Sequence, residues 1–276
     1  SLTKERGGRH GGKGHEFQRY WALCHLLKLD LEKDDYLLLI EFIEDVAVLD
    51  TAVAPTKLDL FQIKKKEGAV GAKWTKTTLA KPPKERVSIL AKLFESKRIS
   101  PDSTATIAFV SNAPVDLTLH DGRESTESER FNADDIEKVL KESLQKSIAG
   151  ELKCPEADIE FGALTFVKSP LAMDDLENHA IGRVSSYLGQ KFPTHGARAD
   201  VFCKALYGEL KIRATSTQDA STFEEICQIR GISKSQFNEM LATTLARKPD
   251  SEIIDAAIAG LVQENVPFVD RNKVKD

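Results

Sequence analysis

Two neighbouring stretches decide the fold: YLLLIEFIEDVAVL at residues 36–49 and KLDLFQIK at residues 57–64. The first is apolar apart from its acids and predicts one bent strand or two strands. The second alternates, so Gln62 and Lys64 share one face of a strand. Because an unpaired buried carboxylate is costly, acids within an apolar strand indicate a functional site. We therefore expect Asp45 to converge with Gln62 and Lys64.

The rest of the chain divides into an α/β part and a helical part. Periodicity predicts helices at 15–29, 85–98, 134–148 and 174–188, strands at 104–110 and 158–167, and an exposed loop at 116–130. Beyond residue 198 no strand is predicted, and helices are expected at 198–213, 221–230, 233–247 and 250–264. We expect a flexible basic, glycine-rich arm (1–14), an α/β core (15–170) and an all-helical extension (171–276).

Composition excludes several classes of protein. The 276 residues carry 39 Lys and Arg against 43 Asp and Glu, a net charge of −4, as in an ordinary globular chain. No apolar stretch is long enough to span a membrane, and residues 1–14 lack the apolar segment of a secretory signal. The four cysteines show no zinc or redox spacing, which favours reduced thiols in the cytoplasm.

The near-neutral total conceals an uneven distribution of charge. Residues 29–61 hold nine acids against two lysines, a net charge of −7, whereas residues 62–98 hold eleven basic residues against three acids, a net charge of +8. Acids can hold a metal ion and bases can contact a phosphate backbone. The alternative is ordinary solvated charge on loops and helix faces.

Motifs for other chemistries are incomplete. The run GGRHGGKG at residues 7–14 approaches the phosphate-binding loop GxxxxGK[ST], but Gly14 replaces the required hydroxyl and no strand precedes the run. A protein that hydrolyses nucleotides with this arm is therefore disfavoured. The six histidines are too dispersed along the sequence to define a metal site.

The chemistry that suits the converging residues is phosphodiester hydrolysis. Asp45, the Gln62 side-chain oxygen and the Ile63 backbone carbonyl are hard oxygen ligands for Mg²⁺ or Mn²⁺. Lys64 would position or activate a water molecule and stabilise negative charge on the phosphate. The structural alternative is an edge-strand glutamine and lysine with Glu44 and Asp45 in a turn.

These residues resemble a known group of nucleases. Gly14-x-x-Phe17-Gln18 at a helix start, Glu44-Asp45 and Gln62-Ile63-Lys64 resemble the restriction-endonuclease-like PD-(D/E)xK superfamily, in its QxK variant. The run GGKGHEFQRYW…FIEDVAV…LDLFQIKKK…WTKTTL…FVSN is similar to the DUF4297 (Cap4-type) nuclease domain of bacterial anti-phage systems.

The resemblance implies a mixed central sheet flanked by helices, and an effector that degrades duplex DNA with little sequence specificity. It also implies a homo-oligomer, a further domain or partner after residue 276, and either a SAVED-type cyclic-oligonucleotide sensor or a HerA-type ATPase as that partner. The acid on the helix of many relatives falls here at Gln18. Glu16 is the alternative metal ligand, and Glu44 is a further candidate beside Asp45.

The basic segment after the catalytic strand is expected to contact DNA phosphates. Its candidates are Lys65, Lys66, Lys73, Lys76 and Lys81, with Trp74 among them. The alternative for the tryptophan is a core anchor. The main competing function is a nucleic-acid-binding or assembly module that has the same fold but does not cut.

Overall fold

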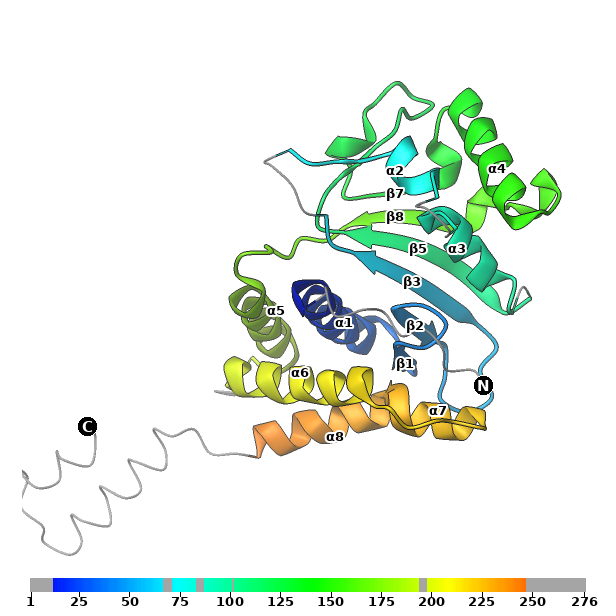
Figure 1. Ribbon diagram of the computed structural model, residues 1–276. Helices are drawn as coiled ribbons and strands as arrows, with labels where there is room; N and C mark the ends of the chain where they lie inside the picture. Colours follow the sequence, from blue (N-terminus) through cyan, green and yellow to red (C-terminus); the bar gives the residue numbers. More distant parts are fainter. Residues whose placement is uncertain (1–11, 67–70, 83–86, 101, 194–197, 247–276) are drawn as a thin grey trace, which may run out of the picture.

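The computed structural model describes residues 12–66, 71–82, 87–100, 102–193 and 198–246. A seven-stranded sheet forms its centre, in the order β7-β8-β5-β3-β2-β1-β9 (Figure 1). Its strands are β1 (Leu37–Ile40), β2 (Val46–Leu49), β3 (Leu58–Lys64), β5 (Thr104–Ser111), β7 (Arg130–Asn132), β8 (Leu164–Lys168) and β9 (Gly231–Ser233). A separate pair joins β4 (Trp74–Thr75) to β6 (Val115–Asp116).

The sheet is mixed, which confirms the predicted α/β class. Strands β3, β5 and β8 are parallel, whereas the β2–β3, β1–β2, β1–β9 and β7–β8 pairs are antiparallel. The stretch 36–49 forms two strands, and the turn between them starts at Glu41, whose φ of 52° lies in the left-handed region. A non-glycine residue rarely adopts this conformation without a reason.

The prediction that no strand follows residue 198 is wrong, because β9 pairs with β1. This strand has three residues, too few for a periodic signal. Gly231 begins it, and a Cβ there would lie 2.5 Å from the carbonyl oxygen of Cys227. The close approach of α7 to the edge strand therefore requires glycine at this position.

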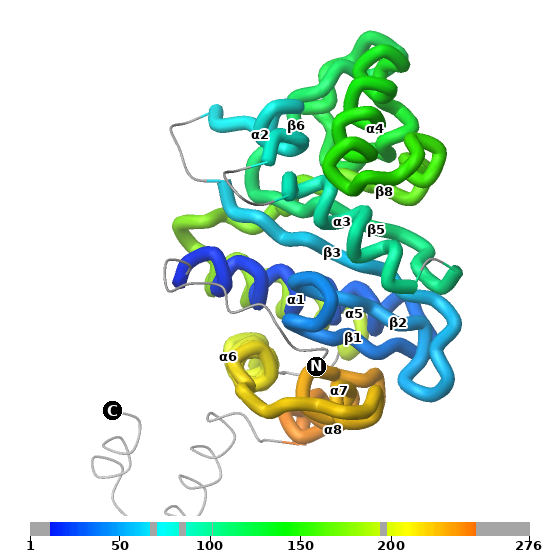
Figure 2. The backbone as a smooth tube through the Cα atoms, turned by 45° about the vertical axis from the view of Figure 1, so that its right-hand side comes forward, coloured from blue at the N-terminus to red at the C-terminus, as the bar shows by residue number. Residues whose placement is uncertain are grey.

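Helices cover both faces of the sheet (Figures 1 and 2). One face packs α2 (Lys76–Ala80), α3 (Ile89–Lys97) and α4 (Lys138–Leu152) in a core with Leu37, Leu39 and Leu60. The other packs α1 (Gly12–Glu32), α5 (Leu176–Lys191), α6 (Ala199–Thr215) and α8 (Lys234–Leu245) around Leu38 and Ile40. Successive leucines of β1 thus enter opposite cores, as strand alternation requires.

The predicted helices have clear local causes. Ser88, Thr222 and Ser233 cap α3, α7 (Phe223–Arg230) and α8. Each side chain accepts a hydrogen bond from the backbone N–H of the residue three positions later. The helix expected at 134–148 begins later, at Lys138, because 133–135 form a 3₁₀ turn capped by Asn132. The expected helix at 250–264 and nearly all of the arm at 1–14 lie outside the described residues.

Helices α5, α6 and α8 share a core with α1. Asp30, at the end of α1, is fully buried and accepts a hydrogen bond of 2.6 Å from the Tyr187 hydroxyl, and its carboxylate also contacts the Lys191 ammonium. In the described residues, no helix combines the length and the apolar character needed to cross a bilayer.

Candidate active site

The candidate site lies at the edge of the sheet where β2 begins and β3 ends. In the antiparallel β2–β3 pair, Val46 is opposite Phe61. Asp45 immediately precedes Val46 and Gln62 immediately follows Phe61, so the two side chains lie next to each other on the same face. The parallel strand β5 supports the other side of β3, with Ser111 opposite Lys64.

Three groups of β3 converge on one oxygen of Asp45. Its Oδ2 accepts hydrogen bonds from the Ile63 backbone N–H at 2.6 Å and from the Gln62 side-chain amide at 2.7 Å. The Lys64 ammonium lies 3.5 Å from the same oxygen. Gln62 is 1% exposed, whereas a third of the Lys64 side chain is exposed and accessible to a substrate. The structure thus brings together the residues predicted to be catalytic.

Helix α1 contributes Gln18. Its side-chain amide donates to the Ile63 carbonyl oxygen at 3.2 Å, and its own oxygen lies 3.0 Å from His15 Nδ1. Glu16 lies on a different side of the helix from Gln18, because positions two residues apart in an α-helix are rotated by about 200°. Among the described residues, Glu16 makes no hydrogen bond to this group. The geometry therefore places Gln18, and not Glu16, beside the backbone oxygen expected to bind metal.

Glu41 is a site residue that the sequence analysis missed. Burial raises the pKa of Glu41, and the negative charge of Asp45 raises it further. Its Oε1 is 3.8 Å from His15 Nδ1, and its backbone N–H donates to the Asp45 carbonyl oxygen at 3.0 Å. The left-handed conformation of Glu41 therefore places a second acid at the edge of the sheet where Asp45 lies. The only sequence signal was its place four residues before Asp45 in an apolar run.

Glu44 points away from this group. It is 3% exposed, and its Oε1 accepts a hydrogen bond of 2.6 Å from the Ser96 hydroxyl on α3. Its other oxygen is buried and has no hydrogen bond within the described residues. Burial raises the pKa of Glu44 to about 7. The side chain predicted as a metal ligand is therefore engaged with α3.

The donor set at the edge suits a divalent cation with a preference for oxygen. Asp45 and Glu41 offer carboxylates, Gln18 and Gln62 offer amides, and Ile63 offers a carbonyl. Asp45 Oδ1 has no hydrogen bond within the described residues, and a cation would relieve the repulsion between the two acids. Across the same residues, no three His, Cys, Asp or Glu side chains form a metal cluster, because most donors at this edge are amide or backbone groups.

Trp74 is a core anchor that also supports the basic segment. It is 8% exposed, packs edge-to-face on Phe109, and donates from Nε1 to the Ser111 hydroxyl at 2.6 Å. The Lys66 ammonium lies 4.3 Å from the centre of its ring, within the range of a cation–π contact. Of the two alternatives for Trp74, the core position is the one observed.

The five lysines predicted to bind DNA are not equivalent. Lys73 is 3.5 Å from the Asp116 carboxylate, and Lys76 donates to the Ser143 hydroxyl at 2.6 Å. Lys65 is partly exposed at the end of β3. Lys66 and Lys81 line one pocket beside Trp74. Of the five, Lys66 and Lys81 are therefore the best placed to meet a phosphate.

Residues 6–214, well over half of the chain, match the family model described as "Cap4, dsDNA endonuclease domain". The chain belongs to this family. The Cap4 match includes every residue of the candidate site and all five lysines. No curated protein matches the chain.

Two solved Cap4 structures resemble the fold at low sequence identity. The Acinetobacter baumannii Cap4 SAVED/CARF-domain containing receptor has 9% identity and a TM-score of 0.49, with 87% of this chain and 48% of the receptor covered. The Moraxella osloensis Cap4 SAVED/CARF-domain containing receptor has 16% identity and a TM-score of 0.49, with 84% and 47% covered. The chain thus spans about half the length of the solved structures it matches.

Proposed function

We propose that this chain is a metal-dependent endonuclease of double-stranded DNA, and that it serves as an effector in bacterial anti-phage defence. The observation that carries the catalytic part is the convergence of Gln62, Ile63 and Lys64 on Asp45 at the end of β3, where a third of the Lys64 side chain is exposed. Membership of the Cap4 double-stranded DNA endonuclease domain family supports the substrate.

The chain's own groups can hold and orient the reacting atoms. Asp45, Glu41 and the Ile63 carbonyl would hold Mg²⁺ or Mn²⁺, with the Gln62 and Gln18 amides completing or supporting the set. When bound, such an ion polarises the scissile phosphate and favours ionisation of the attacking water. Gln62 and the Ile63 N–H hold the Asp45 carboxylate through Oδ2, so its second oxygen would be left to bind the ion.

Lys64 would act on the phosphate itself. Its ammonium, held near Asp45, can contact a phosphate oxygen and the attacking water, and it stabilises the negative charge that develops as the new P–O bond forms. The bond from phosphorus to the leaving sugar oxygen breaks, and that oxygen takes a proton from solvent. The roles given to these groups involve phosphate, metal ion or water, and phosphate contacts carry no sequence information, which supports cleavage with little sequence preference.

The regulatory setting is also part of the proposal. The two solved Cap4 receptors are SAVED/CARF-domain containing proteins, and this chain spans about half of their length. A SAVED-type sensor or a HerA-type ATPase as the partner, a homo-oligomeric active state and a cytoplasmic location remain predictions from the sequence.

The decisive experiment is cleavage of supercoiled plasmid and linear duplex by the purified chain with Mg²⁺ or Mn²⁺, and with EDTA. We expect cleavage that EDTA abolishes and that Lys64→Ala lowers by at least about 100-fold. Lys57→Ala, which removes an exposed lysine just before the same strand, is the matched control and should cut normally. Equal cleavage by the Lys64 variant and the wild type would refute the assignment, and duplex binding without cleavage would favour a non-catalytic binding module.

A further inference from the structure

Two residues after β3 ends at Lys64, the chain reaches a pocket that the proposed chemistry does not use. This Trp74 pocket has a volume of about 390 Å³, and its walls include Lys66, Trp74, Thr77, Lys81, Pro82 and Ile89. Of these residues, Thr77 belongs to α2 and Ile89 to α3. These two helices cover one face of the sheet (Figure 2).

Hydrogen bonds fix the Lys66 backbone and the Trp74 ring in the wall of the pocket. The side-chain oxygen of Asn112 accepts from the Lys66 backbone N–H at 2.7 Å, and its amide donates to the Lys66 carbonyl oxygen at 3.3 Å. Asn112 therefore pairs with the Lys66 backbone as a neighbouring strand would. Ser111, which is fully buried, fixes the Trp74 ring by accepting its N–H.

The spacing fits a DNA strand that already contacts Lys64. Lys66 follows Lys64 by two residues, so at about 3.3 Å per residue their Cα atoms are no more than about 7 Å apart. A DNA strand carries one charge per roughly 3.4 Å of helix axis. A strand whose scissile phosphate meets Lys64 therefore has its next one or two phosphates near this pocket.

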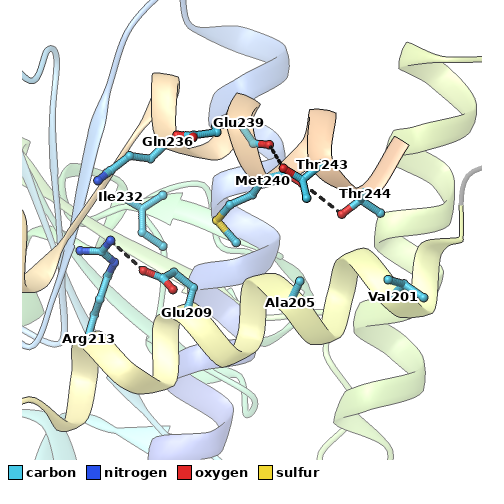
Figure 3. A pocket seen from close by; sticks show the side chains of 10 residues that line it. All are labelled: Val201, Ala205, Glu209, Arg213, Ile232, Gln236, Glu239, Met240, Thr243 and Thr244. Carbon is cyan, nitrogen blue, oxygen red and sulfur yellow. Dashed lines mark hydrogen bonds and ion pairs between the residues drawn. The ribbon is translucent and has the colours of Figure 1, made fainter. Parts of the chain in front are cut away.

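The charges of the pocket are available to an anion. Among the described residues, neither Lys66 nor Lys81 has a carboxylate partner, and the Thr77 hydroxyl makes no hydrogen bond. A second cavity, of about 410 Å³ between α6 and α8, differs in this respect (Figure 3). There the Arg213 guanidinium is 2.7 Å from the Glu209 carboxylate and is neutralised by it.

We propose that the Trp74 pocket is a subsite for a backbone phosphate of the DNA strand next to the scissile bond. Lys66 and Lys81 contact the phosphate, the Thr77 hydroxyl donates to it, and Pro82 and Ile89 line the side that meets the sugar. This inference rests on the proposed function, because it uses the same strand of DNA.

The test measures duplex affinity separately from cleavage. Fluorescein-labelled duplex is titrated with the catalytically impaired Lys64→Ala chain over a series of salt concentrations, alone and combined with Lys66→Gln or Lys81→Gln. Lys211→Gln, an exposed lysine of α6 on the opposite face of the sheet, is the matched control. Thermal melting of each variant establishes that it is folded.

Loss of a phosphate contact should weaken binding about fivefold for each pocket lysine and lower the slope of log Kd against log salt by about 0.9. Lys211→Gln should change neither quantity. If duplex is bound but the pocket variants match Lys211→Gln, the subsite is refuted and the proposed function stands. If the Lys64→Ala chain binds no duplex and the wild type cuts none, both are refuted together.

Discussion

Glu44 provides a test of how burial next to Asp45 changes the protonation of a carboxyl group and, through it, the stability of the fold. The carboxyl group is 3% exposed, touches Ser96, and has a pKa that burial raises from 4.5 to about 7. The folded chain therefore keeps this proton at pH values where the unfolded chain has released it. Between about pH 4.5 and 7 the folded state binds more protons, so the free energy of unfolding decreases as pH rises.

The size of the effect follows from the shift. A rise from 4.5 to about 7 corresponds to about 3 kcal/mol of stability lost by pH 8. Glu44→Gln preserves the acceptor for Ser96 and cannot ionise, so it removes this penalty. We expect the variant to match the wild type near pH 4 and to exceed its unfolding free energy by about 3 kcal/mol at pH 8.

Urea denaturation in EDTA, at half-unit steps from pH 4 to 8, measures this difference. Glu95→Gln, which removes an exposed carboxylate next to Ser96 on α3, is the matched control and should give no comparable gain. A Glu44→Gln chain that is less stable than the wild type at pH 8, or a gain that is the same at every pH, would contradict the reasoning.

Three further outcomes are expected. Glu41→Gln should raise the Mg²⁺ concentration for half-maximal cleavage about tenfold, which a metal titration of the cleavage rate measures; an unchanged requirement would remove Glu41 from the site. Asp30→Asn should lower the unfolding free energy by about 2 kcal/mol in urea titrations, because it removes the charge that Lys191 contacts; a loss below about 0.5 kcal/mol would contradict that role. Millimolar Mg²⁺ should raise the melting temperature of the wild type and not that of Asp45→Asn, and an equal rise in both would place the ion elsewhere.

The sequence predicted the parts of the fold that have strong periodicity. Alternation in residues 57–64 and the apolar run at 36–49 located β3, β2 and β1, and helical spacing located α1, α5, α6 and α8. Short elements gave no such signal. Strand β9 has three residues and is held by its pairing with β1 and by the close approach that Gly231 permits.

The candidate site was predictable where it depends on register. The pairing of β2 with β3 places Asp45 beside Gln62. Strand alternation places Gln62 and Lys64 on the same face of β3. Glu41 was missed because its position depends on a left-handed turn, and Glu44 was placed in the site because a sequence cannot tell which of two adjacent acids faces α3. The partners of Lys73 and Lys76 were not predictable either, because Asp116 and Ser143 lie far from them in the sequence.

Single-turnover cleavage of duplex DNA by Asp45→Asn, at protein concentrations that saturate the DNA, tests the central claim most directly. The substitution retains the shape of the side chain but removes the charge on which Gln62, Ile63 and Lys64 converge. The account predicts duplex affinity close to that of the wild type and a cleavage rate lower by at least about 100-fold. Cleavage by Asp45→Asn at the wild-type rate would show that the chemistry takes place elsewhere.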